Sequence, residues 1–170
     1  MIVTPDSVRA IVEVKTSLDS PSKIKEAIKK LATAKALCLG TRRETHRSHV
    51  WAGLFVYDSP EDRDLLLLQT VAEALNETKA VIDGIAFGPD RVVKHFFLET
   101  VSGSEARSYW QTGVAPNLAA TVFIGGMLEA VGDVSYSSDT SAWYPADPDG
   151  QHTFYLREGD KEPRPGFPKW

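Results

Sequence analysis

The sequence predicts an α/β domain in which helices flank a central sheet. Short apolar runs rich in β-branched residues alternate with longer segments of helical periodicity, as in folds that pack helices against a sheet. The hydrophobic content of 42% and the charged content of 25% are ordinary for a globular domain. A chain of 170 residues matches one domain, which we place at residues 1–160, with a proline-rich extended tail at 161–170.

The segment from Ala10 to Leu18, AIVEVKTSL, predicts the first strand. Alternate side chains of a strand share a face. One face therefore carries Ile11, Glu13 and Lys15, and the other carries Ala10, Val12 and Val14.

A helix is predicted from Ser20 to Gly40. Ser20 is a suitable N-cap, Pro21 suits the first helical position, and Gly40 suits the C-terminal end. Apolar residues recur at helical spacing, so we expect this side to pack on the sheet. The lysines fall mainly on the other sides and are expected to face solvent: Lys23, Lys25, Lys29 and Lys30.

The remaining elements follow from the same periodicities and from turn residues. The apolar run VWAGLFVY predicts a central strand, and the segment after it predicts a second helix with Leu65 in its buried stripe. Residues 100–113 are polar and are expected to form a loop, and PNLAATVFIGGMLEAV predicts a helix buried in the core or at a dimer contact. The predicted strands are 50–57, 80–87 and 92–99, the predicted helices 58–76 and 116–131, and a short hairpin is expected within 142–156.

Charge and composition limit the binding partners and the cellular location that we expect for this protein. The net charge is −4, so contact with nucleic acid would need a local basic patch. The single cysteine, Cys38, lies in an apolar run and is expected to be a small buried hydrophobe. No apolar run approaches the roughly 18 residues of a membrane span, and the first residues lack a signal-peptide pattern. We therefore expect a cytoplasmic protein without membrane contact.

Glu13 and Lys15 are the first candidate site residues. They lie two positions apart on one strand face, roughly 6.6 Å along the strand, so both can reach one pocket. At this separation we expect them not to collapse into a closed ion pair. A carboxylate and an ammonium so placed form a usable catalytic half-site, whereas the structural alternative is a surface pair on an edge strand.

The segment IVEVKTSLD with the lysine-rich helix after it resembles the PD-(D/E)xK nuclease superfamily, and most closely the uncharacterised family DUF6602. The resemblance implies a restriction-endonuclease-like fold with a mixed central sheet. It also implies that Glu13 is a metal ligand, that Val14 offers its backbone carbonyl, and that Lys15 is the catalytic lysine. The implied cofactor is Mg²⁺ or Mn²⁺.

The chain departs from the family pattern in its upstream acid. The family's Asp lies on a strand before Glu-x-Lys, but only twelve residues precede Glu13 here, and Pro5-Asp6 is seven residues away. The chain resembles a family member shortened at its N-terminus. Candidates for the second acid are Asp6, Glu26 on the following helix, and Asp83 in the predicted strand 80–87, where a bend beside Gly84 is the alternative.

The segment TRRETHRSH, residues 41–49, is the most basic of the chain, and its three arginines are suited to phosphate binding: Arg42, Arg43 and Arg47. Two functions therefore remain open. The first is a metal-dependent nuclease acting on phosphodiester bonds, and the second is an inactive nuclease-like domain that binds DNA or another protein. The expected partners are DNA and a second copy of the chain.

Overall fold

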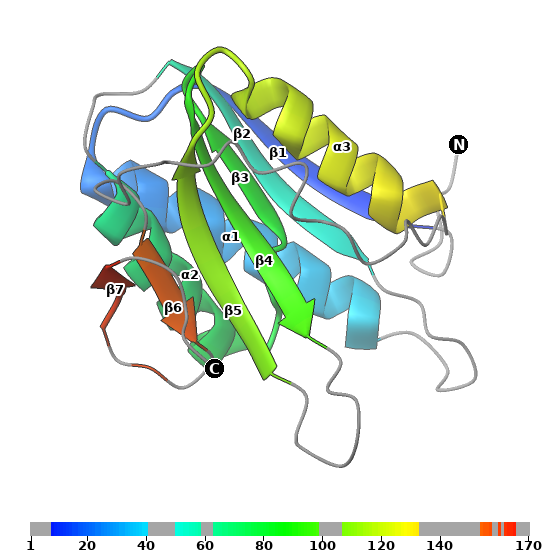
Figure 1. The fold of residues 1–170 in the computed structure, drawn as a ribbon. Helices are drawn as coiled ribbons and strands as arrows, with labels where there is room; N and C mark the ends of the chain where they lie inside the picture. Colours follow the sequence, from blue (N-terminus) through cyan, green and yellow to red (C-terminus); the bar gives the residue numbers. More distant parts are fainter. Residues whose placement is uncertain are drawn as a thin grey trace.

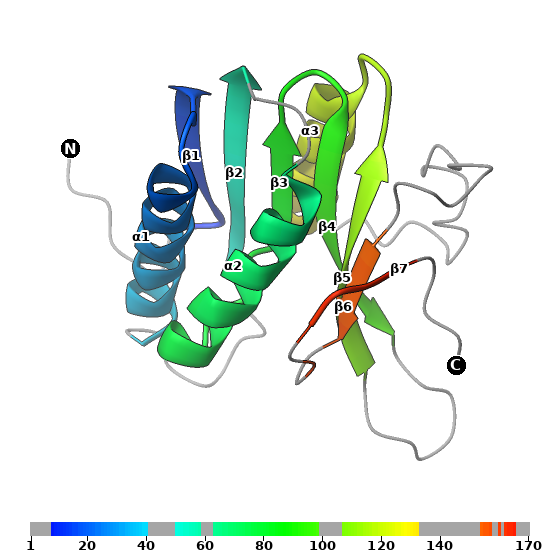
Figure 2. The same cartoon turned by 90° about the vertical axis from the view of Figure 1, so that its left-hand side faces the viewer.

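The protein is a three-layer structure with a mixed sheet in the middle. The computed structural model describes residues 8–40, 50–58, 63–98, 107–132, 154–157, 160 and 162–165. Within these ranges, seven strands form one sheet in the order β1-β2-β3-β4-β5-β6-β7. Helices α1 and α2 cover one face, and α3 covers part of the other (Figures 1 and 2). The predicted α/β class with a mixed sheet flanked by helices is confirmed.

The first half of the sheet is parallel and is built from two strand–helix–strand units. The parallel register places Glu13 of β1 beside Leu54 of β2, and Leu54 beside Ile85 of β3. Both crossover helices lie on the same face, where Lys25 and Lys29 of α1 pair with Glu73 and Glu77 of α2. The elements are β1 Ala10–Ser17, α1 Pro21–Gly40, β2 Trp51–Asp58, α2 Asp64–Thr78 and β3 Gly84–Phe87.

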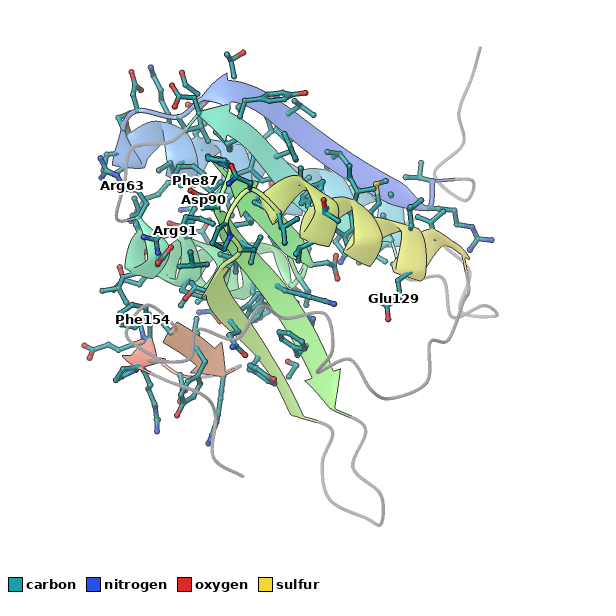
Figure 3. The ribbon with its side chains drawn as sticks, turned by 45° about the horizontal axis from the view of Figure 1, so that its top comes forward. Arg63, Phe87, Asp90, Arg91, Glu129 and Phe154 are labelled. Atoms are coloured by element: carbon teal, nitrogen blue, oxygen red, sulfur yellow. The ribbon has the colours of Figure 1, made fainter. Side chains whose placement is uncertain are left out.

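The second half of the sheet is antiparallel. A turn at residues 88–90 leads from β3 into β4, and Arg91 at the start of β4 reaches the Asp64 carboxylate of α2 at 2.7 Å (Figure 3). The short β7 falls within the segment predicted as an extended tail. The elements are β4 Arg91–Leu98, β5 Arg107–Val114, β6 Phe154–Arg157 and β7 Arg164–Pro165.

The prediction of a loop over residues 100–113 was wrong for its second part. Arg107–Val114 is a strand that pairs with β4 along its whole length. Its sequence, RSYWQTGV, lacks a clear apolar alternation, and its polar Gln111 and Thr112 are nevertheless buried. Pairing with the apolar β4 and with β6 sets its conformation, and a local pattern does not report such long-range pairing.

The main core lies between the sheet and the α1–α2 layer. Its members are almost fully buried aliphatic side chains of both helices and the central strands, together with Trp110 of β5. The Trp110 indole donates a hydrogen bond to the carbonyl of Ile82 at 2.7 Å, which satisfies its polar atom within the core. Leu65, predicted in the buried stripe of α2, is 45% exposed instead.

Helix α3, Ala119–Gly132, packs on the opposite face of the sheet against β2, β3 and β4. Of the two positions expected for this helix, burial in the core holds for only part of it in the described chain. Ala119 and Phe123 are buried, but Ile124, Leu128 and Val131 are each at least 40% exposed. Within the described ranges, no helix combines the length and the apolar character needed to cross a membrane.

Candidate functional site

Strand β1 lies at one edge of the described sheet, next to α1 (Figure 2). Glu13 and Lys15 lie on its α1 side, where they line one depression with residues of that helix. The alternation along β1 agrees with the prediction, because Ile11, Glu13 and Lys15 are partly buried while Val12 and Val14 are exposed. Ile11 packs against the main core. This contact fixes which face of β1 turns toward α1 and so directs the next two side chains of that face toward the helix.

The two side chains form a closed ion pair, contrary to expectation. Lys15 Nζ lies 2.8 Å from Glu13 Oε1, and Lys30 Nζ of α1 approaches the same oxygen at 3.4 Å. The long lysine side chain spans the strand spacing. The Glu13 carboxylate is thus held by two ammonium groups, one from its own strand and one from the helix above it.

These contacts favour the charged forms of both partners. The hydrogen bond from Lys15 is the main cause that lowers the pKa of Glu13 below its ordinary value of 4.5, against a smaller effect of burial. The same hydrogen bond, with the charge of Glu13, raises the pKa of Lys15 above 10.5. At neutral pH the pair is therefore fully ionised.

Glu26 joins this pair in one depression of about 210 Å³. Pro21 begins α1 directly after a short turn, in which Ser20 Oγ accepts a hydrogen bond from the Lys23 N–H at 3.4 Å. The first turns of α1 therefore lie over the end of β1. The depression is lined by Glu13, Lys15, Ser17, Leu18, Lys23, Glu26, Ala27 and Lys30.

The donor set of this depression fits a weakly held Mg²⁺ or Mn²⁺. Mg²⁺ commonly takes one or two protein carboxylates and keeps several of its waters, and Glu13 and Glu26 supply two carboxylates. The described part of the chain contains no cluster of three or more His, Cys, Asp or Glu side chains suited to a metal ion. The two carboxylates of the depression would therefore suit a hydrated cation and not a fully coordinated one.

Other predicted site residues lie elsewhere. Asp6, Arg42, Arg43 and Arg47 fall outside the described residues. Asp83 does not line the depression. It lies directly before β3, which begins at Gly84, so the prediction of a mid-strand position was wrong.

The Asp83 carboxylate binds two other parts of the fold. Its Oδ2 accepts a hydrogen bond from the Ala52 N–H of β2 at 2.7 Å and lies 2.6 Å from Lys35 Nζ of α1. Lys35 also donates to the Val81 carbonyl at 2.7 Å. The side chains of Lys35 and Asp83 are 3% and 8% exposed, so this is a buried ion pair.

Sequence reasoning missed Lys35. Burial is the main effect on its pKa, which is lowered from 10.5 against the opposing influence of Asp83. The helical spacing of Ile24, Ile28 and Leu31 continues to position 35, so a lysine on the apolar stripe was a usable signal. Such a lysine requires a buried acid as its partner.

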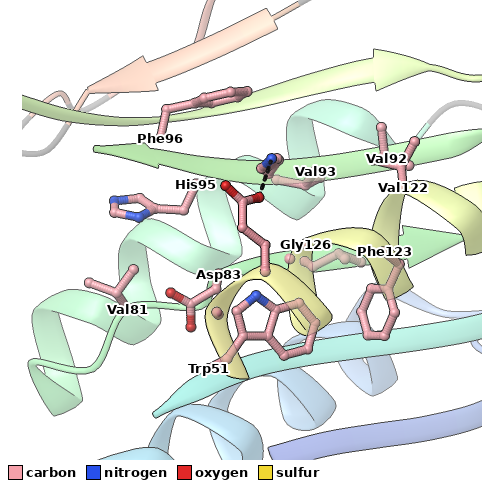
Figure 4. Close-up of a pocket in the computed structure, with 15 residues that line it drawn as sticks. Trp51, Val81, Asp83, Val92, Val93, His95, Phe96, Val122, Phe123 and Gly126 are labelled. Carbon is pink, nitrogen blue, oxygen red and sulfur yellow. Dashed lines mark ion pairs between the residues drawn. The ribbon is translucent and has the colours of Figure 1, made fainter. Parts of the chain in front are cut away.

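A larger cavity, of about 660 Å³, opens on the α3 side of the sheet (Figure 4). Trp51, Phe123 and Val122 provide apolar lining, while Asp83 and His95 lie at one end of the cavity. Lys94 and Glu129, whose charged atoms are 3.9 Å apart, form a partly exposed pair in its lining. A largely apolar cavity with a few polar groups has the character of a small-molecule site.

Comparison of the chain with protein-family models, curated proteins and solved structures found no match. The resemblance to the PD-(D/E)xK superfamily and to DUF6602 therefore stays a hypothesis that rests on the Glu13-Val14-Lys15 segment and the helix after it.

Proposed function

We propose that this protein hydrolyses phosphodiester bonds of DNA at the depression between β1 and α1, with a hydrated divalent cation as cofactor. The observation that carries the proposal is the meeting of Glu13, Glu26 and Lys15 in one depression. These residues come from the strand and the helix that carry the sequence resemblance. A cytoplasmic location and DNA as partner belong to the same proposal.

The residues have separate roles in this proposal. Glu13 and Glu26 would hold the cation, and the backbone carbonyl of Val14 would be a third ligand, as the resemblance implies. When bound, the cation supplies a water of lowered pKa and positive charge near the scissile phosphate. The role of Lys15 in this proposal is to orient the attacking water through its ammonium group. Lys23 and Lys30, which line the same depression, attract the phosphate backbone.

Calorimetric titration with Mn²⁺ tests the metal ligands. We expect binding by the unchanged protein and a loss of at least about tenfold in affinity for Glu13→Gln and for Glu26→Gln, since each removes one of two carboxylates. Glu77→Gln is the matched control, because Glu77 is an exposed acid that pairs with Lys29 of α1 outside the depression. Equal affinity in all four proteins would overturn the metal site.

Cleavage of single- and double-stranded DNA in Mg²⁺ or Mn²⁺ tests the activity. Lys15→Ala should keep Mn²⁺ binding but lose about 100-fold or more in cleavage rate, as expected for a group that positions the attacking water. Undiminished cleavage by Lys15→Ala would contradict its role.

For the alternative function, an inactive nuclease-like domain, we expect different results in assays of DNA binding and cleavage. If that domain binds DNA, binding should occur without metal and without cleavage, and it should weaken on charge reversal of Arg42, Arg43 and Arg47. If it binds another protein instead, neither DNA binding nor cleavage is expected.

A further inference from the structure

Among the residues that the structure describes, no strand pairs with the outer edge of β1. The Arg9 carbonyl accepts a hydrogen bond from the Trp51 N–H at 3.0 Å, so residue 9 directs its backbone groups toward β2. Backbone direction alternates along a parallel strand. Val12, Val14 and Thr16 therefore present their N–H and C=O groups at the open edge.

This edge has only part of the usual protection against pairing. Natural edge strands are commonly guarded by proline, by a bulge or by charged side chains. The strand Ala10–Ser17 contains no proline, and the charges of Glu13 and Lys15 balance each other. On the other face, Val12 and Val14 are 37% and 54% exposed, and the main sheet contacts of α3 are with β2, β3 and β4.

We propose that β1 pairs antiparallel with β1 of a second copy of this chain, with Val14 opposite the partner's Val14. A two-fold axis normal to the sheet keeps the α1–α2 layers of both copies on one side, as a continuous sheet requires. Opposed residues then lie on the same face of the sheet, so the two residue numbers of each opposed pair are both odd or both even. Charge decides among the registers that meet this condition.

The register centred on Val14 places Glu13 opposite the partner's Lys15, and Lys15 opposite the partner's Glu13. These are non-hydrogen-bonded positions, where side chains of facing strands lie closest. A shift of the centre to Glu13 would oppose two glutamates, and a shift to Lys15 would oppose two lysines. Like charges directly opposite destabilise a strand pair. Among these three registers, the one centred on Val14 is complementary in charge.

The pairing makes the depression a composite of both copies. Each Glu13 carboxylate gains the partner's Lys15 beside its own Lys15 and Lys30. On the opposite face Val14 packs on the partner's Val14, and Val12 lies beside the partner's Thr16. The pairing does not depend on the proposed nuclease function. The pairing also uses the Val14 carbonyl, which is a ligand in the proposed metal site. Its tests are therefore made in the presence of a chelator, so that a failure of the pairing can be distinguished from a failure of the metal site.

Cysteine cross-linking of the full chain tests the register, with Cys38→Ser as the background because Cys38 is the only native cysteine. Opposed Cα atoms at a hydrogen-bonded pair are about 5.5 Å apart, within reach of a disulfide. Val14→Cys should therefore give a covalent dimer on oxidation. Val12→Cys is the matched control, since the two copies of residue 12 would lie about 14 Å apart, four residues along the strand. Equal cross-linking of both variants, or of neither, would overturn the register.

Sedimentation of charge variants tests the pairing itself. The unchanged protein should sediment as a dimer at high concentration, and Lys15→Glu should raise its dissociation constant by about tenfold or more, because two symmetry-related attractions become repulsions. The double variant Glu13→Lys/Lys15→Glu restores complementarity and should restore the dimer, which a loss of folding could not do. The proposal would be refuted if the protein were a monomer at all concentrations, or if neither variant changed the dissociation constant of the dimer.

Discussion

Glu13 gains its chemical character from two lysines that approach the same oxygen atom. The contact with Lys15 at 2.8 Å is local, since both residues lie on β1, whereas the contact with Lys30 depends on the placement of α1. Both contacts stabilise the carboxylate form. A cation that binds Glu13 must therefore compete with two ammonium groups, which agrees with a weakly held metal ion.

Replacement of Lys15 by alanine should raise the pKa of Glu13 toward 4.5, because the Lys15 hydrogen bond is the largest cause of its lowering. A carboxyl group with a lowered pKa in the folded state stabilises the fold above the unfolded value, and this contribution is lost as the pH falls through the folded pKa. The variant should thus lose less stability between neutral pH and the acid range. NMR titration of the Glu13 side chain measures the shift, and an unchanged pKa would contradict the hydrogen bond.

At the scale of elements, a buried ion pair joins α1 to the start of the two central parallel strands. Asp83 binds Lys35 of α1 and the Ala52 N–H of β2, and its backbone carbonyl accepts a hydrogen bond from the His95 N–H of β4 at 2.9 Å. Lys35 in turn binds the Val81 carbonyl. One carboxylate thus connects a helix to neighbouring strands, and its buried charge is tolerated because it has partners.

Removal of one partner of the Lys35–Asp83 pair should lower the free energy of unfolding more than removal of both. Lys35→Met leaves the Asp83 carboxylate buried without its ammonium, and we expect a loss of about 3–5 kcal/mol in the free energy of unfolding. Lys35→Met/Asp83→Asn removes both charges and keeps an acceptor for the Ala52 N–H, so it should be more stable than Lys35→Met alone. Urea unfolding measures both, and strictly additive losses would show that the two charges are not coupled.

At the scale of the whole molecule, the third layer is attached through aromatic packing. The Trp51 indole lies against Gly53 and Gly84, where a Cβ atom would overlap it. Phe123 of α3 meets the Trp51 ring edge-on, with centroids 4.9 Å apart, and also contacts the Phe55 ring. The glycines of β2 and β3 thus provide the space in which the indole lies, and α3 packs on that aromatic surface.

Two glycine-to-alanine changes should have opposite effects. Gly53→Ala forces the Trp51 ring away from the sheet and should lower the free energy of unfolding by about 1–3 kcal/mol, as overpacking does. Gly125→Ala is the matched control within α3, because a Cβ atom there meets nothing within 4 Å. It should stabilise the protein by up to about 1 kcal/mol through helix propensity. Thermal unfolding compares them, and a neutral Gly53→Ala would show that the Trp51 contact is not tight.

The sequence by itself determined the elements whose apolar periodicity is strong, and with them the α/β class. It also placed Glu13 and Lys15 on one face of a strand, because side-chain alternation is a local property of the backbone. Tertiary structure decided the rest. The strand at Arg107–Val114, the pairing of Lys35 with Asp83, and the meeting of Glu26 with Glu13 all join segments distant in sequence. Such contacts depend on how helices and strands pack, which a local pattern of residues does not encode.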